Sequence, residues 1–347
     1  MALYETYMQR CLQLAALGMG NVSPNPVVGS VLVYESKIIG EGYHQQYGTA
    51  HAEVNCINSV EADDKNLIEH STLYVSLEPC SHHGKTPPCT DLILKNKIKK
   101  VVIGCKDSSS KVNGLGIKLL KENGVEVIEN VLAAECIEIN KRFFHFEKYK
   151  QPYIILKWAE TADGFIGKQN ETTKISNTFT DRIAHQWRTD EDAIMVGYYT
   201  ALTDNPSLSV RYAMGSNPLR IVFDKHLALP QTHHLFDNTQ STIVLNFDEN
   251  KTSGLTEYIK VEEQNYLPQM LNVLYEKKIQ SLIIEGGSSL LQKFIDAEIW
   301  NEARVLKSNH FLYEGIQAPI LKNATAISEL SIRNDVVYFH KNNSQKI

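Results

Sequence analysis

Hydrophobic residues along this chain alternate between helical and strand-like spacing. In the first half, helical spacing predicts helices over residues 4–18, 51–57, 89–95, 116–122 and 131–147. Short runs rich in β-branched residues predict strands over residues 27–34, 38–42, 73–77, 101–105 and 125–128. Strands that alternate with helices indicate an α/β domain, in which a sheet is layered with helices.

A polar, charged segment at Glu147–Pro152 interrupts this pattern, and the alternation then begins again. Strands are predicted over residues 153–158, 193–196, 220–224, 241–245 and 282–284, and helices over 180–189 and 288–297. A chain of 347 residues is long enough for two domains that each bury a core. We therefore expect two α/β domains, residues 1–147 and 150–347.

Composition and charge narrow the classes of function. The chain has 43% hydrophobic and 22% charged residues, as globular proteins do, and its net charge of −5 gives no basic field for nucleic acid. It contains no run of about 18 apolar residues that would cross a membrane. The N-terminal residues lack a secretion-signal pattern, so the six cysteines fit reduced thiols or metal ligands in the cytoplasm.

Two short motifs indicate zinc chemistry. One motif contains His51 and Glu53, with one residue between them, and the other contains Cys80 and Cys89, with eight residues between them. Together they supply an imidazole, a carboxylate and two thiols. Three protein ligands and an open fourth position are typical of catalytic zinc, which lowers the pKa of a bound water to about 7. His-x-Glu with Pro-Cys-x-x-Cys is the pattern of zinc nucleobase deaminases, although their cysteines are closer together.

Two other interpretations of these motifs stay open. His82 or His83 would make the site structural by closing it as a fourth ligand. A zinc-stabilised binding module would need the same three ligands, but it would have no use for Glu53. The glutamate therefore favours a deaminase.

The two motifs, together with Asn25–Gly29 and Gly42–His44, resemble the deaminase half of the bifunctional deaminase–reductase family of riboflavin biosynthesis. The resemblance implies an N-terminal cytidine-deaminase-like three-layer α/β/α domain with Glu53 as general acid and base. It implies zinc ligands at His51, Cys80 and Cys89. It also implies a substrate pocket lined by Asn25, His44, His82, Lys85 and Asp107.

Some of these residues have ordinary alternatives. Asn25 precedes a proline, where asparagine is a usual turn residue. Lys85 is a single lysine, and single lysines are ordinarily solvated at the surface. Ser109 stands where the family commonly has asparagine, so the sugar-phosphate contacts of that segment are expected to differ.

The second half resembles the reductase half of the same family through Asp204–Arg211, which matches the family's Asp-(Asp/Asn)-Pro-x-Leu-(Thr/Ser)-x-Arg run. The resemblance implies a dihydrofolate-reductase-like α/β domain that uses NADPH. Implied substrate-binding residues are Thr172, Arg188, Leu208, Arg211 and Glu285, with Lys157 as a further residue to test. Implied cofactor-binding residues are Ala159, Lys174, Thr200, Asp204, Lys225, Gly287, Ser288, Ser289, Leu290, Leu291, Gln292 and Lys293.

This half also allows plainer interpretations. Arg188 and Arg211 can clamp a phosphate with two hydrogen bonds each, but surface arginines usually form salt bridges. Gly286-Gly287 before a predicted helix exposes backbone N–H groups to a phosphate, and it is equally typical of a tight turn. Lys174 stands where the family commonly has tryptophan, so cofactor contacts there are expected to change.

The implied activity is bifunctional. Zinc-dependent hydrolytic deamination of 2,5-diamino-6-ribosylamino-4(3H)-pyrimidinone 5′-phosphate precedes NADPH-dependent reduction of the ribosyl chain, which gives 5-amino-6-ribitylaminouracil 5′-phosphate. The expected cofactors are Zn²⁺ and NADPH, and the expected partners are this small molecule and further copies of the chain. A nucleoside or tRNA deaminase with an unrelated C-terminal domain is the alternative, which the spacing of Cys80 and Cys89 disfavours.

Overall fold

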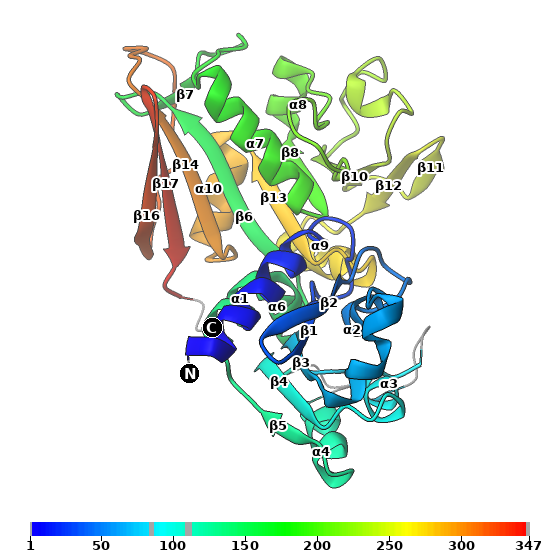
Figure 1. Ribbon diagram of the computed structural model, residues 1–347. Helices are drawn as coiled ribbons and strands as arrows, with labels where there is room; N and C mark the ends of the chain where they lie inside the picture. The colour runs from blue at the N-terminus through cyan, green and yellow to red at the C-terminus, as the bar shows by residue number, and fades with distance from the viewer. Residues whose placement is uncertain (1, 83–86, 108–112, 345–347) are drawn as a thin grey trace. The chain divides into compact units, whose positions relative to one another are not determined.

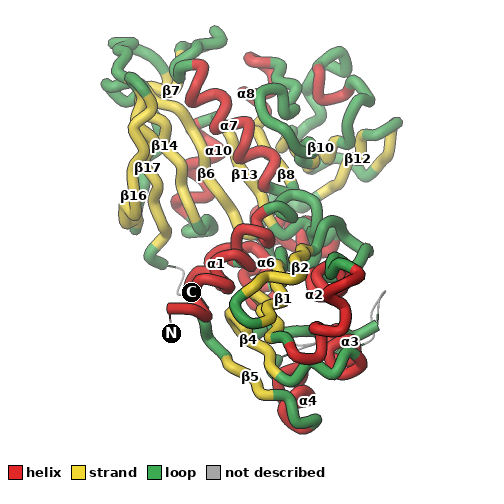
Figure 2. The backbone as a smooth tube through the Cα atoms, in the orientation of Figure 1, coloured by secondary structure: helices red, strands yellow, loops and turns green. Residues whose placement is uncertain are grey.

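The computed structural model describes residues 2–82, 87–107 and 113–344. The chain divides into two compact units, Met1–Lys150 and Gln151–Ile347 (Figure 1). Strands and helices alternate in both units (Figure 2). No helix in the described ranges has both the length and the apolar character needed to cross a membrane.

The first unit is built on one sheet. Its strands in the described residues are β1 (Gly29–Tyr34), β2 (Lys37–Tyr43), β3 (Thr72–Leu77), β4 (Lys100–Cys105) and β5 (Glu126–Ile128), in the spatial order β2-β1-β3-β4-β5. β1 is antiparallel to β2 and β3, whereas β3, β4 and β5 are parallel. The residues that follow β3 and β4 therefore lie at the same edge of the sheet.

Successive strand residues point to opposite faces of this sheet, and both faces carry apolar side chains. Helices therefore cover both faces. Leu32 and Ile103 face α2 (Ala52–Asn58), α3 (Cys89–Lys95) and α4 (Leu115–Glu122). Val31 and Val102 face α1 (Ala2–Ala16) and α5 (Ala133–Ile139). The predicted three-layer α/β/α architecture is confirmed. The unit also contains a 3-10 helix, η1 (Ala62–His70), and α6 (Lys141–Tyr149).

The prediction of one helix over residues 131–147 is wrong, because α5 and α6 meet at Asn140. The Asn140 side chain is buried and pairs with the backbone of Val27. Its Oδ1 accepts from the Val27 N–H at 2.9 Å, and its Nδ2 donates to the Val27 carbonyl at 2.9 Å. Asparagine side chains compete in this way with helix geometry. The break therefore anchors the segment that leads from Asn25 into β1.

The second unit is built on a larger, mixed sheet. The spatial order in the described residues is β11-β12-β10-β9-β8-β13-β6-β14-β17-β16. The strands from β12 to β14 are parallel, and β11, β17 and β16 are antiparallel to their neighbours. Their bounds are β6 (Tyr153–Glu160), β8 (Ala193–Gly197), β9 (Leu219–Phe223), β10 (Thr242–Asn246), β11 (Lys251–Ser253), β12 (Thr256–Lys260), β13 (Ser281–Glu285), β14 (Glu302–Ser308), β16 (Ala324–Ile332) and β17 (Asp335–Asn342).

Helices again cover both faces. Leu156 and Ile284 face α9 (Tyr266–Glu276) and α10 (Ser288–Asp296), and Ile155 and Ile283 face α7 (Thr178–Asp190) and α8 (Tyr198–Asp204). Outside the main sheet, β7 (Phe165–Gly167) pairs with β15 (Ile316–Gln317), and η2 (His234–Phe236) is a short 3-10 helix. The predicted α/β class of this half is confirmed. α8 and α10 begin where β8 and β13 end, so both helices start at one edge of the parallel strands.

We predict that Asn140→Ala destabilises the first unit. The substitution leaves the N–H and carbonyl of Val27 without their buried partners, which costs about 2 kcal/mol or more. Urea unfolding measures the loss. The control is Asn66→Ala at an exposed position, for which we expect a change below about 0.5 kcal/mol. Equal effects of the two substitutions would show that the Val27 contacts are not needed.

Candidate functional site

Three potential metal ligands converge at the edge where β3 ends. His51 directly precedes α2, Cys80 follows β3, and Cys89 is the first residue of α3. Their ligand atoms all lie within 4.8 Å of one another. His51 Nδ1 lies 3.5 Å from Cys80 Sγ and 3.4 Å from Cys89 Sγ, so Nδ1 is the ring nitrogen that faces both sulfurs.

This donor set fits a catalytic zinc ion. One imidazole and two thiols are the soft and borderline ligands that zinc prefers. Across the described residues, the group contains no fourth His, Cys, Asp or Glu. His82 is exposed, and His83 lies outside the described residues. Glu53, in the first turn of α2, is buried beside the cluster.

Burial and neighbouring groups shift the pKa values of Cys80 and Glu53. Hydrogen bonds with Cys89 and His51 lower the pKa of the Cys80 thiol to about 4, although burial opposes this shift. Burial raises the pKa of Glu53, and the neighbouring Cys80 raises it further. A thiolate is the form that binds a metal, and a carboxyl group with a raised pKa is suited to exchanging protons near neutral pH.

A hydrogen-bonded chain joins Asn25, His44 and the backbone just before His51. His44 Nδ1 lies 3.0 Å from the Ala50 carbonyl, and Asn25 Nδ2 lies 3.0 Å from His44 Nε2. A carbonyl only accepts, so Nδ1 carries the proton and Nε2 of the neutral ring accepts from Asn25. Burial lowers the pKa of His44, which favours this neutral form. The Asn25 amide is thereby oriented through its Nδ2, and no residue in the described ranges donates to its Oδ1.

Two of the other predicted pocket residues, Asp107 and His82, lie within the described part of the chain. Asp107 is buried just after β4, and its backbone N–H donates to Glu78 Oε2 at 3.2 Å. His82 is exposed at the surface of the unit. Lys85 and Ser109 lie outside the described residues.

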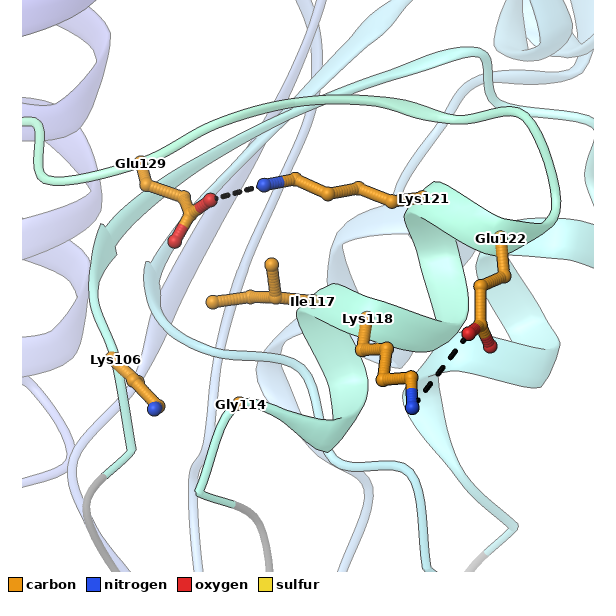
Figure 3. Close-up of a pocket in the computed structure, with 7 residues that line it drawn as sticks. All are labelled: Lys106, Gly114, Ile117, Lys118, Lys121, Glu122 and Glu129. Atoms are coloured by element: carbon orange, nitrogen blue, oxygen red, sulfur yellow. Dashed lines mark hydrogen bonds and ion pairs between the residues drawn. The ribbon is translucent and has the colours of Figure 1, made fainter.

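A separate cavity of about 330 Å³ lies beside α4 (Figure 3). Two of its lysines have carboxylate partners: Lys121 Nζ lies 2.6 Å from Glu129, and Lys118 Nζ lies 3.8 Å from Glu122. The cavity contains none of the predicted site residues. Its lining is Lys106, Gly114, Ile117, Lys118, Lys121, Glu122 and Glu129.

In the second unit, Glu285 at the end of β13 is the centre of a buried ionic group. Arg188 on α7 makes two hydrogen bonds to its carboxylate, at 2.9 and 2.8 Å, and a third to the Ser209 carbonyl at 3.0 Å. Lys157 pairs with Glu285 in register across β6 and β13, and its Nζ lies 3.6 Å from Oε2. Burial alone would raise the pKa of Glu285, but Arg188 and Lys157 lower it to about 2.

Thr200, on α8, lies against the glycine pair that precedes α10. A Cβ on Gly287 would lie 2.8 Å from Thr200 Oγ1, and both Gly286 and Gly287 have positive φ, near 68° and 69°. Glycine is the residue that tolerates both conditions. The structure thus brings together two predicted cofactor-binding residues, Thr200 near the start of α8 and Gly287 just before α10. Asp204 ends α8, where burial raises its pKa and the Thr172 side chain opposes this shift.

Other predicted reductase residues have specific local partners. Arg211 is exposed, and its Nη1 donates to Ser207 Oγ at 3.1 Å. Leu208 is buried with a φ of 52°. Lys174 lies 3.1 Å from Asp181, and Ala159 pairs with Leu306 across β6 and β14. Lys225 and Lys293 lie over the rings of Phe247 and Tyr266, at 5.5 and 5.6 Å.

The remaining α10 residues divide by face. Leu290 and Leu291 are buried in the core, whereas Gln292 bonds to the backbone N–H of Ile320 at 2.8 Å. Ser288 and Ser289 form the first turn, directly after the glycine pair. The first turn is therefore the part of α10 whose backbone is placed to meet a ligand.

Sequence reasoning missed His185, which lies one helical turn before Arg188 on α7. Its Nδ1 accepts the backbone N–H of Arg211 at 3.0 Å, so it connects α7 to the Asp204–Arg211 segment. Burial and the charges of Arg188 and Arg211 lower its pKa to about 4. The spacing of three residues from Arg188 is the signal that places both side chains on one helix face.

Comparison with known proteins agrees with both halves of the structure. Residues 1–105 match the cytidine and deoxycytidylate deaminase zinc-binding region, and residues 152–312 match the RibD C-terminal domain. The chain is 38% identical to riboflavin biosynthesis protein RibD of Bacillus amyloliquefaciens over 337 residues, covering 94% of this chain and 87% of that protein. It is 34% identical to RibD of Aquifex aeolicus over 340 residues, covering 96% and 94%.

A solved structure is similar over the whole chain. The diaminohydroxyphosphoribosylaminopyrimidine deaminase/5-amino-6-(5-phosphoribosylamino)uracil reductase of Thermotoga maritima superposes with a TM-score of 0.91 at 32% identity, covering 98% of this chain and 99% of that one.

The fold and the comparisons define a two-domain enzyme, with a zinc-dependent deaminase followed by a reductase. The chain belongs to the RibD family of bifunctional riboflavin biosynthesis enzymes. The resemblance inferred from the motifs is confirmed, and the alternative with an unrelated C-terminal domain is wrong. Zn²⁺ and NADPH are the cofactors of these two domains. A phosphorylated pyrimidine substrate is consistent with this family.

We predict that Glu285 makes the second unit sensitive to acid. Its pKa is about 2 in the folded protein and ordinarily near 4.5, so ionised Glu285 stabilises the fold fully above about pH 4.5, and this contribution is lost as the pH falls toward 2. In urea unfolding across that range, wild-type stability falls more steeply than that of Glu285→Gln. The control, Glu257→Gln, removes an exposed partner of Lys277 and keeps the wild-type slope. Equal slopes for wild type and Glu285→Gln would contradict the prediction.

Proposed function

We propose that the first unit deaminates 2,5-diamino-6-ribosylamino-4(3H)-pyrimidinone 5′-phosphate, and that the second reduces the ribosyl chain of the product to give 5-amino-6-ribitylaminouracil 5′-phosphate. The observation that carries this proposal is the convergence of His51 Nδ1 and the two cysteine sulfurs within 4.8 Å, with Glu53 buried beside them. The family membership of the whole chain supports the order of the two reactions.

In the deaminase, His51, Cys80 and Cys89 would hold zinc. When bound, zinc supplies Lewis acidity that makes a water nucleophilic at neutral pH. Glu53 would take up the two protons of the attacking water in turn, and would pass one to the ring nitrogen and the other to the departing amine. Asn25 is oriented through His44, so its Oδ1 accepts from an N–H group of the pyrimidine.

The other predicted pocket residues complete this proposal. Asp107 lies on the segment after β4 that we assign to the sugar-phosphate side of the pocket. His82 and Lys85, in the connection between the two cysteines, are assigned to the same pocket on the basis of the family resemblance alone.

In the reductase, NADPH supplies the hydride for C1′ of the ribosyl chain. Arg188 and Lys157 keep Glu285 ionised, which makes its carboxylate an acceptor for the hydroxyl groups of that chain. Because Arg188 already bonds to Glu285 and Ser209, the exposed guanidinium of Arg211 is the better candidate for the substrate phosphate. Thr172 and Leu208 complete the proposed substrate contacts.

The cofactor is proposed to lie along the edge where β6, β8, β9 and β13 end. The Thr200 hydroxyl and the backbone of the turn before α10 are in contact, so both can donate to the same phosphate. Lys225 and Lys293, which lie over the rings of Phe247 and Tyr266, are further proposed cofactor contacts. The remaining proposed contacts are Ala159, Lys174, Asp204, Gly287, Ser288, Ser289, Leu290, Leu291 and Gln292.

The proposal also covers the domain boundaries, the oligomeric state and the cellular location of the protein. We assign the deaminase to residues 1–147 and the reductase to residues 150–347, which is supported by the compact units. A homo-oligomer is supported by the exposed edge strand β16, where Ile327 is 57% exposed. Cytoplasmic location is supported by the six cysteines, all of which are free thiols. We propose no role in binding nucleic acid or membranes.

Product analysis tests the proposed function. The enzyme is supplied with the diaminopyrimidine ribotide, with and without NADPH, and the products are identified by mass. We expect the deaminated ribotide without NADPH and the ribityl product with it. A zinc chelator should stop ammonia release but spare NADPH oxidation on pre-deaminated substrate. Unchanged substrate in both conditions would exclude the proposed function.

We predict that Glu53→Gln abolishes deamination while zinc remains bound. The amide cannot exchange a proton, so kcat for ammonia release falls by at least about 100-fold. Metal analysis and an ammonia assay measure the two properties separately, and NADPH oxidation on pre-deaminated substrate is the internal control. Turnover within tenfold of wild type would remove Glu53 from the proton-transfer role.

We predict that Arg211→Ala weakens binding of the reductase substrate. Loss of a charge-assisted hydrogen bond to phosphate raises KM about tenfold or more, with a smaller change in kcat. Steady-state NADPH oxidation measures both constants. Arg182→Ala, at an exposed position on α7, is the matched control and should leave KM unchanged. An unchanged KM for Arg211→Ala would assign the phosphate to another residue.

A further inference from the structure

Glu78 is a buried carboxylate in the deaminase unit with no role in the mechanism above. It lies between β3 and Cys80, and only 4% of its surface is exposed. Its backbone N–H donates to the Cys105 carbonyl at 3.0 Å, which extends the pairing of β3 with β4. The described residues provide it with no cationic partner.

Four backbone N–H groups surround this carboxylate. Oε2 accepts from Asp107 at 3.2 Å and from Gly114 at 3.0 Å, and Oε1 accepts from Gly116 at 3.0 Å and Ile117 at 3.2 Å. All four contacts are donors, so the ionised carboxylate satisfies each of them. Three of them come from the beginning of α4, whose dipole also favours a negative charge there.

The start of α4 also packs against the backbone of Pro79, the residue before Cys80. A Cβ on Gly116 would lie 2.1 Å from the Pro79 carbonyl oxygen, so this position has no room for a side chain. Pro79 is bonded directly to Cys80. Hydrogen bonds and close packing therefore both hold α4 against the residues that lead into the metal cluster.

Cys80 has independent support from α3. Its carbonyl accepts from the Thr90 N–H at 3.2 Å, and its sulfur accepts from the Cys89 N–H at 3.4 Å. The metal ligand is thus held from the α3 side whether or not Glu78 is present. The backbone N–H of Asp107 donates to the carboxylate of Glu78.

We propose that Glu78 is a positioning residue for the deaminase substrate: its carboxylate holds Asp107 and the start of α4 in place beside the metal cluster. It acts through these backbone groups and touches neither zinc nor substrate. The inference rests on the proposed assignment of Asp107 to the substrate pocket. It gives the glutamate before Pro79 a role in substrate affinity, separate from the role of the cysteines in metal binding.

Two substitutions test this inference in the full-length, zinc-loaded enzyme. Glu78→Gln keeps the shape but turns one acceptor oxygen into an NH₂ group that faces two N–H donors. Glu78→Asp keeps the charge but shortens the reach, so it remains informative should the glutamine variant not fold. For both we expect KM for deamination to rise about tenfold or more, with a smaller change in kcat and one zinc per chain retained. Amide hydrogen exchange should accelerate in peptides that contain Gly116 and Ile117.

The control is Glu129→Gln, which removes a partner of Lys121 in the last turn of α4 (Figure 3). It should leave KM, zinc content and exchange unchanged, and all variants should retain NADPH oxidation on pre-deaminated substrate. A KM within twofold of wild type for both Glu78 variants would overturn the inference. Loss of zinc would also overturn it, because Glu78 would then act on the ligands. Absence of ammonia release by the wild-type enzyme would instead refute the proposed function itself.

Discussion

In both units, parallel strands that end at a common edge position several of the proposed functional side chains. In the first unit, β3 and β4 run in parallel and are followed by Cys80 and Asp107. In the second, β6, β8 and β13 end beside Glu285 and the helix that carries Thr200. Ligands of α/β proteins bind at this edge because loops and helix starts gather there. Two different chemistries therefore use the same geometric solution.

The two units treat a buried glutamate in opposite ways. Glu285 lies between Arg188 and Lys157, which keep it ionised and hold its pKa at about 2. Among the described residues Glu53 has no such pair of arginine and lysine partners, and burial raises its pKa. The first arrangement suits a carboxylate that accepts hydrogen bonds in every state of the reaction. The second suits a group that binds and releases a proton, so the surroundings rather than the residue type separate the two proposed roles.

The sequence predicted local features well and long-range contacts poorly. His51, Cys80 and Cys89 could be recognised because each stands at a strand end or helix start with a distinctive spacing. The ion pair of Arg188 and Glu285 joins residues 97 positions apart, and no local pattern indicates it. The break at Asn140 has the same origin, because its partner Val27 is 113 positions away. Strand β16 gave no signal because nearly all its residues are exposed, so neither of its faces shows a buried alternation.

The pairing of Asn140 with Val27 has a consequence for biosynthesis of the protein. The segment that carries Asn25 lies near the N-terminus, yet the amide that anchors it is among the last parts of this unit to leave the ribosome. A nascent chain that has emerged only as far as β5 includes β1 to β5 and all three cluster residues, but it still lacks the Asn140 amide. The hydrogen bonds that anchor Val27 can therefore form only after Asn140 has left the ribosome, which is later than the emergence of all three potential metal ligands.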